Sequence, residues 1–200
     1  TTARKQLARF RLALKEPYIQ FLRELAVECR NSNLVISVDN YVPAEYNAFY
    51  DLEEQGKIVD YVIIMGYDEH YVGSDAGSVA SLGFVADAAK NTLAKVPAER
   101  VIMAVPFYTR LWKETRQKDG SIALTSETIG IAAADALLRE NKVSTTWQAD
   151  AGQFYGEYEQ LKLGFMSNLN VTLHKYMLFY SLKFFVPSCE DNKIYHKIQL

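Results

Sequence analysis

The sequence has 200 residues, and its 49% hydrophobic content is enough to bury a full core, as one domain or as part of a larger one. A net charge of −2 argues against nucleic acid as the main partner, because such binding needs a concentrated basic surface. No stretch is apolar enough to span a bilayer, and Cys29 and Cys189 have the spacing of neither a zinc site nor a disulfide framework.

The first half of the chain predicts helices and strands in alternation. Apolar residues recur every three or four positions over residues 17–30, which predicts a helix. The β-branched run 34–38 predicts a strand that ends in polar residues. A second helix is expected from Pro43 to Leu52, closed by Gly56, and the next strand over residues 58–66.

The second half begins with a polar loop over residues 72–78, which suits the lining of a site. A helix is expected over 84–93 and a third strand over 101–105. After a longer excursion to Gly120, residues 126–141 are expected to form a helix that begins at a Ser126 cap. This alternation favours an α/β fold with parallel strands.

Two apolar runs end abruptly in aromatic and charged residues. One ends in Met65-Gly66-Tyr67-Asp68 and the other continues into Pro106-Phe107-Tyr108-Thr109-Arg110-Leu111-Trp112. Strands of this kind are typical of β/α folds that place their chemistry at the carboxyl ends of strands. Taken alone, a Tyr-Asp pair in this position is more often a capped strand end than a catalytic site.

Together the two blocks resemble glycoside hydrolase family 18, the chitinase-like barrels, and most closely its bacterial spore-associated branch that acts on peptidoglycan-type amino sugars. The loop 73–81 and the segment 147–155 also look like that branch. The resemblance covers about residues 17–160. It implies an α/β fold in which this part is a partial (β/α)8 TIM barrel, roughly strands five to seven with their helices.

The resemblance also implies a retaining hydrolysis in which the N-acetyl group of the substrate acts as the nucleophile. By position, Tyr67 would donate its hydroxyl to the acetamido oxygen and Asp68 would hydrogen-bond the sugar. Tyr108, Arg110 and Trp112 would form the sugar-binding wall and Met65 the floor. An aromatic core under a long loop is the alternative for Tyr108 and Trp112.

Two further residues stand near these blocks. Asn40 ends another predicted strand and is included among the substrate-binding candidates. His70 follows Asp68 closely, but substrate-assisted chemistry gives it no required task, so a hydrogen bond within the loop is expected for it. No metal and no cofactor is expected.

The sequence departs from the family at both ends. The signature Asp-x-x-Asp-x-Asp-x-Glu, which carries the catalytic acid, is absent before residue 17, and the isolated Glu16 is not expected to replace it. Both ends are basic around an acidic centre. The expected organisation is therefore a non-family segment at 1–16, a partial barrel at 17–160 and a basic aromatic tail at 161–200, arising from a truncated, rearranged or frame-shifted reading of a longer gene.

The function expected from the resemblance is a glycoside hydrolase for N-acetylglucosamine-containing glycans of the chitin or peptidoglycan type, present here as an inactive fragment. The alternative is a non-catalytic sugar-binding or vestigial module. A half barrel also leaves sheet edges uncovered, so self-association is a third expectation. The family context favours a secreted protein, or one at the cell wall or spore surface.

Overall fold

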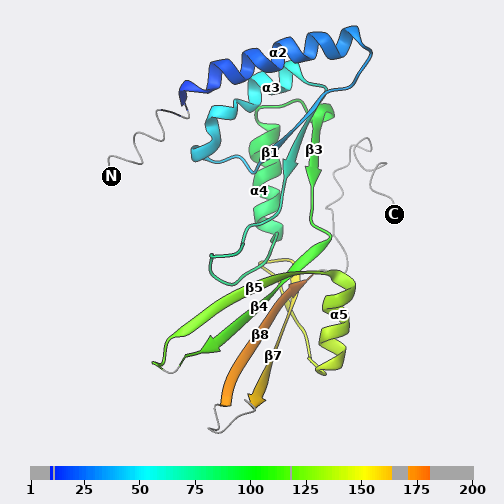
Figure 1. The fold of residues 1–200 in the computed structure, drawn as a ribbon. Coiled ribbons are helices and arrows are strands. Elements are labelled where there is room, and N and C mark those ends of the chain that lie inside the picture. The colour runs from blue at the N-terminus through cyan, green and yellow to red at the C-terminus, as the bar shows by residue number, and fades with distance from the viewer. Residues whose placement is uncertain (1–9, 11, 118, 164–170, 181–200) are drawn as a thin grey trace. The chain divides into compact units, whose positions relative to one another are not determined.

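The computed structural model describes residues 10, 12–117, 119–163 and 171–180. They divide into two compact units (Figure 1). Unit 1 contains the described residues up to Gly66 together with 86–104, and unit 2 contains 67–85 together with the described residues from 105 to 180. Within this described part, no helix has the length and apolar character needed to cross a membrane.

Unit 1 is built on three parallel strands in the order β1-β2-β3. They are β1 (Ser37–Tyr41), β2 (Tyr61–Met65) and β3 (Val101–Ala104). Asn40 lies opposite Ile64, and Ile64 lies opposite Met103. The predicted parallel arrangement is therefore confirmed for this unit. Its first two strands begin three residues later than expected, and Leu34 and Val35, which were expected in the first strand, are 61% and 71% exposed.

The helices of unit 1 alternate with the strands in the predicted order, beginning with a helix. They are α2 (Lys15–Asn31), the 3₁₀ helix η1 (Glu45–Tyr50), α3 (Leu52–Ile58), α4 (Leu82–Leu93) and the 3₁₀ helix η2 (Ala98–Arg100). The first four residues of α4 belong to unit 2 and the rest to unit 1. The predicted helix over 17–30 is confirmed, since Ile19, Leu22 and Ala26 turn one face of α2 into the core.

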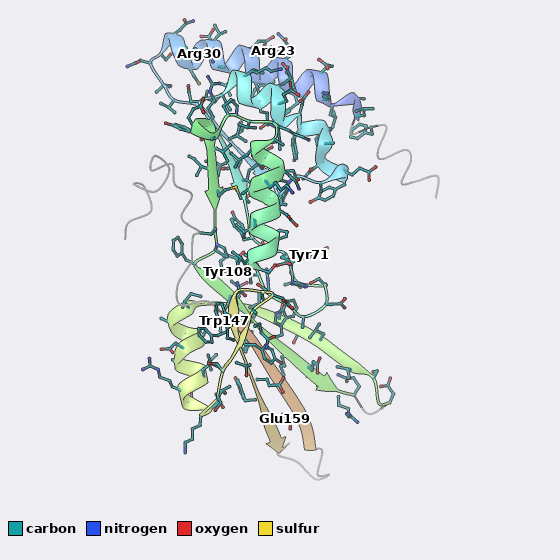
Figure 2. All side chains as sticks on the ribbon, turned by 180° about the vertical axis from the view of Figure 1, so that it is seen from behind. Arg23, Arg30, Tyr71, Tyr108, Trp147 and Glu159 are labelled. Carbon is teal, nitrogen blue, oxygen red and sulfur yellow. The ribbon has the colours of Figure 1, made fainter. Side chains whose placement is uncertain are left out.

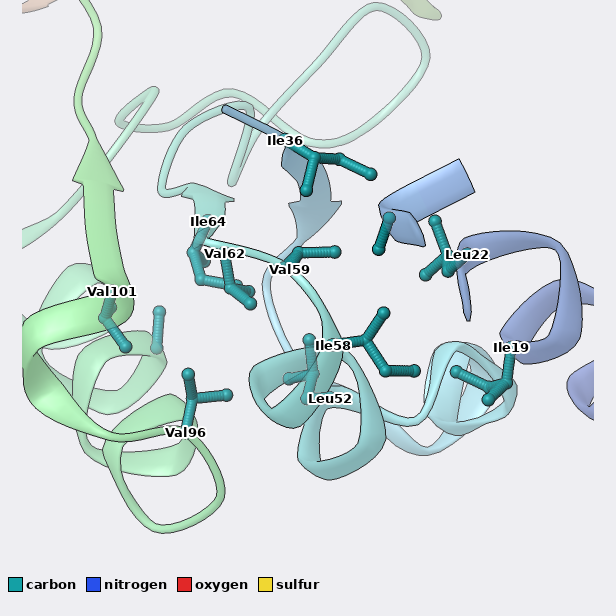
Figure 3. Close-up of a cluster of buried hydrophobic side chains, with 12 residues drawn as sticks. Ile19, Leu22, Ile36, Leu52, Ile58, Val59, Val62, Ile64, Val96 and Val101 are labelled. Carbon is teal, nitrogen blue, oxygen red and sulfur yellow. The ribbon is translucent and has the colours of Figure 1, made fainter. Parts of the chain in front are cut away.

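The core of unit 1 lies between the helices and one face of the sheet (Figure 3). Ile19 and Leu22 of α2 belong to the same buried cluster as Val62 and Ile64 of β2. Burying each of these aliphatic side chains fully stabilises the fold by roughly 1.5–3 kcal/mol. The opposite face of the sheet carries more exposed residues, among them Tyr41 at 57% and Ile102 at 40%.

The prediction that Gly56 closes a helix is wrong. Gly56 lies inside α3, where a Cβ atom would come within 3.0 Å of a Val96 methyl group, so the glycine allows close packing instead. The break between the two helices comes earlier, at Asp51, which caps the N-terminus of α3. Its φ is 49°, and its carboxylate accepts a hydrogen bond from the Glu54 amide. In place of the helix expected over 43–52, the structure has the short 3₁₀ helix η1, which ends just before Asp51.

Unit 2 contains a five-stranded antiparallel sheet in the order β5-β4-β8-β7-β6 (Figure 1). Its strands are β4 (Tyr108–Arg116), β5 (Ile122–Gly130), β6 (Thr146–Gln148), β7 (Gln153–Leu163) and β8 (Val171–Tyr180). The helix α5 (Ile131–Glu140) buries Ala134 and Leu138 against a cluster that includes Leu111, Ile129 and Phe154.

The antiparallel sheet departs from the predicted alternation. Residues 122–130 pair with β4 as a hairpin, so the helix expected from Ser126 begins only at Ile131. Gly120, at φ 84°, lies in the turn between the two strands. β7 runs through the boundary predicted at residue 160. No closed barrel is present among the described residues.

Candidate functional site

The carboxylate of Asp68 is the centre of a polar cluster in unit 2. Its Oδ1 accepts a 2.7 Å hydrogen bond from the Tyr108 hydroxyl and a 3.1 Å hydrogen bond from Nη2 of Arg110. Tyr108 lies at the start of β4 (Figure 2), and two residues further along the strand Arg110 comes back to the same side. The strand thus brings both donors to one carboxylate oxygen.

Asp68 adopts a left-handed backbone conformation, with φ at 59°. Asp and Asn tolerate this conformation better than other residues with a side chain, and contacts of the neighbouring residue hold Asp68 in it. The next residue, Glu69, supplies them: its amide donates to the Val79 carbonyl at 2.8 Å, and its carboxylate accepts from the Ser81 amide at 2.7 Å and the Ser81 hydroxyl at 3.0 Å.

The cluster joins a buried cation to a partly exposed anion. Arg110 is only 8% exposed, whereas 44% of the Asp68 side chain is exposed. A buried guanidinium needs a counter-ion, and Asp68 supplies it. Burial raises the pKa of Tyr108 above its ordinary value, and the hydrogen bond to Asp68 raises this pKa further, because both disfavour the phenolate.

Several polar groups of the cluster have no partner among the described residues. These are Nε of Arg110, which is buried, the hydroxyl of Tyr67 and Oδ2 of Asp68. The Tyr67 ring meets the Tyr108 ring edge to face, with centroids 6.3 Å apart. The cluster therefore offers one donor, the Tyr67 hydroxyl, and one acceptor, Oδ2 of Asp68, to a polar ligand, whereas Nε of Arg110 is buried.

Trp112 lies in the interior of unit 2. Its exposed fraction is 1%, and its Nε1 donates a 2.8 Å hydrogen bond to the Gly77 carbonyl. Trp112 is therefore an aromatic core residue under a loop, which was the alternative to a sugar-binding role. Its burial does not support the sugar-binding role. The exposed aromatic residue of this block is Phe107, at 62%, which the sequence interpretation passed over although it stands next to Tyr108.

Asn40 and Met65 belong to unit 1. Asn40 is 2% exposed, and its amide exchanges two hydrogen bonds with Gln55, at 2.8 Å and 3.1 Å. That is the arrangement of a structural core pair, so we leave Asn40 out of the candidate site. Met65 ends β2 half-buried, two residues before Tyr67 in the chain.

Within the described residues, His70 and Glu16 are not placed for a catalytic role. Nδ1 of His70 lies 2.8 Å from the Ser78 carbonyl, which confirms the predicted hydrogen bond within the loop. Glu16 is exposed in the first turn of α2. No group of three or more potential ligands within this part of the chain could hold a metal ion, and Cys29 is a free thiol, whereas Cys189 lies outside it.

Comparison with known proteins gives a match over most of the chain. Residues 11–168 match the family described as Glycosyl hydrolases family 18. The match starts before residue 17 and continues past residue 160, so it is longer than the range expected from the sequence motifs.

Individual relatives cover shorter stretches. The uncharacterized glycosylase YvbX of Bacillus subtilis is 30% identical over 113 residues, which are 56% of this chain and 31% of the relative. The solved structure of the putative sporulation-specific glycosylase YdhD of Bacillus subtilis is similar with a TM-score of 0.65 at 21% identity, over 82% of this chain and 53% of that one.

The solved structure of the spore cortex-lytic enzyme SleL of Bacillus cereus is similar with a TM-score of 0.67 at 22% identity. The similarity covers 86% of this chain and 37% of that one. At this level of identity the likeness concerns the fold. The chain thus spans about a third of the curated relative YvbX and about half or less of these two solved structures.

Proposed function

Because this chain belongs to family 18 of the glycosyl hydrolases, we propose that Tyr67, Asp68, Tyr108 and Arg110 hold an N-acetylglucosamine unit of an amino-sugar glycan. The observation that carries the proposal is the double contact on Oδ1 of Asp68, made by the Tyr108 hydroxyl and by Arg110. It immobilises one side of an exposed carboxylate while Oδ2 stays available to a ligand.

Each group of the cluster has a task that fits an N-acetylated sugar. Oδ2 of Asp68 accepts a hydrogen bond from a sugar hydroxyl, and the hydroxyl of Tyr67 donates one to the acetamido oxygen. The exposed ring of Phe107 offers a flat apolar surface to the apolar side of a pyranose. Met65 belongs to unit 1, and the role expected for it as the floor of the site stays a prediction.

Hydrolysis in this family depends on a glutamic acid that protonates the leaving glycosidic oxygen while the acetamido oxygen attacks the anomeric carbon. The motif that carries this acid does not occur in the 200 residues. Glu69 does not replace it, because both of its carboxylate oxygens already accept hydrogen bonds from Ser81. We therefore propose that this chain binds the glycan without cleaving it, as one half of a glycosidase site.

The fold supports the same proposal. The sheet β1-β2-β3 has the parallel order and intervening helices of consecutive units of a β/α barrel, and we assign it to strands five to seven of the family barrel. Tyr41 and Ile102 are exposed on its second face. We further propose that this face and the sheet edges support self-association, which light scattering would reveal as a mass above that of one chain.

Incubation with a chromogenic N-acetylglucosamine oligomer tests the missing acid directly. The proposal expects retention of the chain on chitin beads but no release of the chromophore above the buffer blank. Release that is lost in the Asp68→Asn variant would contradict it. A chain that shows neither retention nor release would contradict the proposed sugar binding.

A further inference from the structure

Gln153, at the start of β7, holds the loop that follows Asp68, although 85 residues separate them in the sequence. Its carboxamide accepts a 2.6 Å hydrogen bond from the Ser78 hydroxyl and donates a 2.7 Å hydrogen bond to the Ala80 carbonyl. The Ala80 amide donates back to the Ser78 hydroxyl at 3.0 Å. With Gln153 only 9% exposed, these bonds form a closed, buried ring.

The same short segment is held from other sides. Trp112 donates to the Gly77 carbonyl, and the His70 ring lies so close that a Cβ atom on Gly77 would come within 2.4 Å of it. The Leu82 amide donates to the Ala151 carbonyl at 2.9 Å, just before Gln153. Residues 77–82 therefore form a rigid support within unit 2.

This support is what Glu69 binds. The Glu69 amide reaches Val79 and its carboxylate reaches Ser81, on either side of Ala80. Since Asp68 is joined directly to Glu69 and has a left-handed backbone, the position of its carboxylate depends on this anchor.

We propose that Gln153 is a positioning residue for Tyr67 and Asp68: through Ala80 and Ser78 it fixes the segment that holds Glu69 and thereby the site. This inference rests on the proposed sugar-binding function for its consequence, but its structural part does not. A carboxamide suits the task because it donates and accepts at once, which neither a carboxylate nor an aliphatic side chain does.

The Gln153→Glu variant gives the sharpest test. Burial raises the pKa of a carboxyl at this position above the ordinary glutamate value, so the two states are compared at about pH 9 and about pH 5. At about pH 9 the carboxylate accepts from Ser78 but has no proton for the Ala80 carbonyl, so the ring opens. At about pH 5 the protonated carboxyl again donates and accepts. Gln153→Leu lacks both groups at any pH, and Gln148→Glu, the same change at an exposed position of β6, is the matched control.

Two measurements are made on the folded full chain at both pH values, each relative to the unsubstituted protein at the same pH. Amide hydrogen exchange at Glu69, Ala80 and Ser81 reports the loop, and titration with an N-acetylglucosamine oligomer reports the site. At the alkaline pH we expect about tenfold faster exchange and about tenfold weaker binding in Gln153→Glu, both recovering at the acid pH, with no recovery in Gln153→Leu.

Unchanged exchange at Glu69 and Ser81 in a folded Gln153→Leu variant overturns the inference, as does a Gln153→Glu variant whose exchange does not depend on pH. Exchange requires no ligand. If the loop responds as expected but the unsubstituted chain binds no oligomer, the proposed function fails and the anchoring role of Gln153 stands.

Discussion

The hydroxyl of Tyr108 donates a 2.7 Å hydrogen bond to Oδ1 of Asp68, forty residues earlier in the chain. Arg110 donates to the same oxygen from the next position on that side of β4. One strand therefore fixes a carboxylate that belongs to a loop, and the free oxygen of that carboxylate is left for a ligand.

Replacing Asp68 by asparagine leaves the buried Arg110 without its counter-ion. We expect a loss of about 1–3 kcal/mol in the free energy of unfolding, below the full cost of breaking a buried pair because Asp68 is partly exposed. Urea denaturation measures the loss. Asp75→Asn, the same change at an exposed position of the following loop, should have little effect, and equal losses in both variants would contradict the ion pair.

The raised pKa of Tyr108 predicts a loss of stability at alkaline pH. The folded chain keeps a phenol proton that the unfolded chain releases above about pH 10, so the free energy of unfolding falls as the pH rises through that range. Tyr108→Phe should make this fall shallower. Denaturation at neutral and alkaline pH, with phenolate absorbance as a second measure, tests this, and an unchanged slope would speak against it.

Gly77 is predicted to be intolerant of any side chain. The Cβ atom of Gly77→Ala would clash with the His70 ring, so either the loop or the ring, which is hydrogen-bonded to the Ser78 carbonyl, must shift, with an expected cost of about 1–3 kcal/mol. Thermal unfolding measures the cost. The double variant with His70→Ala should recover much of the loss, and a double variant no more stable than the single one would place the clash elsewhere.

Asn40 is predicted to act only in the core of unit 1. Asn40→Ala leaves the buried Gln55 amide short of two hydrogen bonds, which should lower stability by about 1–3 kcal/mol. Affinity for an N-acetylglucosamine oligomer, measured on the folded variant, should stay unchanged. A selective loss of affinity without a loss of stability would restore Asn40 to the site.

The sequence was sufficient to predict the parallel arrangement of unit 1 and to single out Asp68, Tyr108 and Arg110. The apolar spacing of α2 and the run before Tyr67 are local signals, and the resemblance to family 18 singled out Tyr108 and Arg110. The resemblance to family 18 is confirmed by the match over residues 11–168.

The rest depends on contacts between distant segments. Residues 122–130 become a strand because β4 pairs with them, and the only local hint is the turn at Gly120. Trp112 is buried under the loop carrying Gly77, whose carbonyl accepts a hydrogen bond from the indole, and the burial of Asn40 depends on Gln55. Neither of these two contacts can be predicted from periodicity or spacing in the sequence.

Calorimetric titration with a short N-acetylglucosamine oligomer, beside the same oligomer without acetyl groups, tests the central claim that this cluster recognises an N-acetylated sugar. We predict heat of binding for the acetylated oligomer alone, with about tenfold weaker binding in Tyr67→Phe because one hydrogen bond to the acetamido oxygen is lost. Equal binding of the two oligomers, or an unchanged affinity in Tyr67→Phe, would contradict the account.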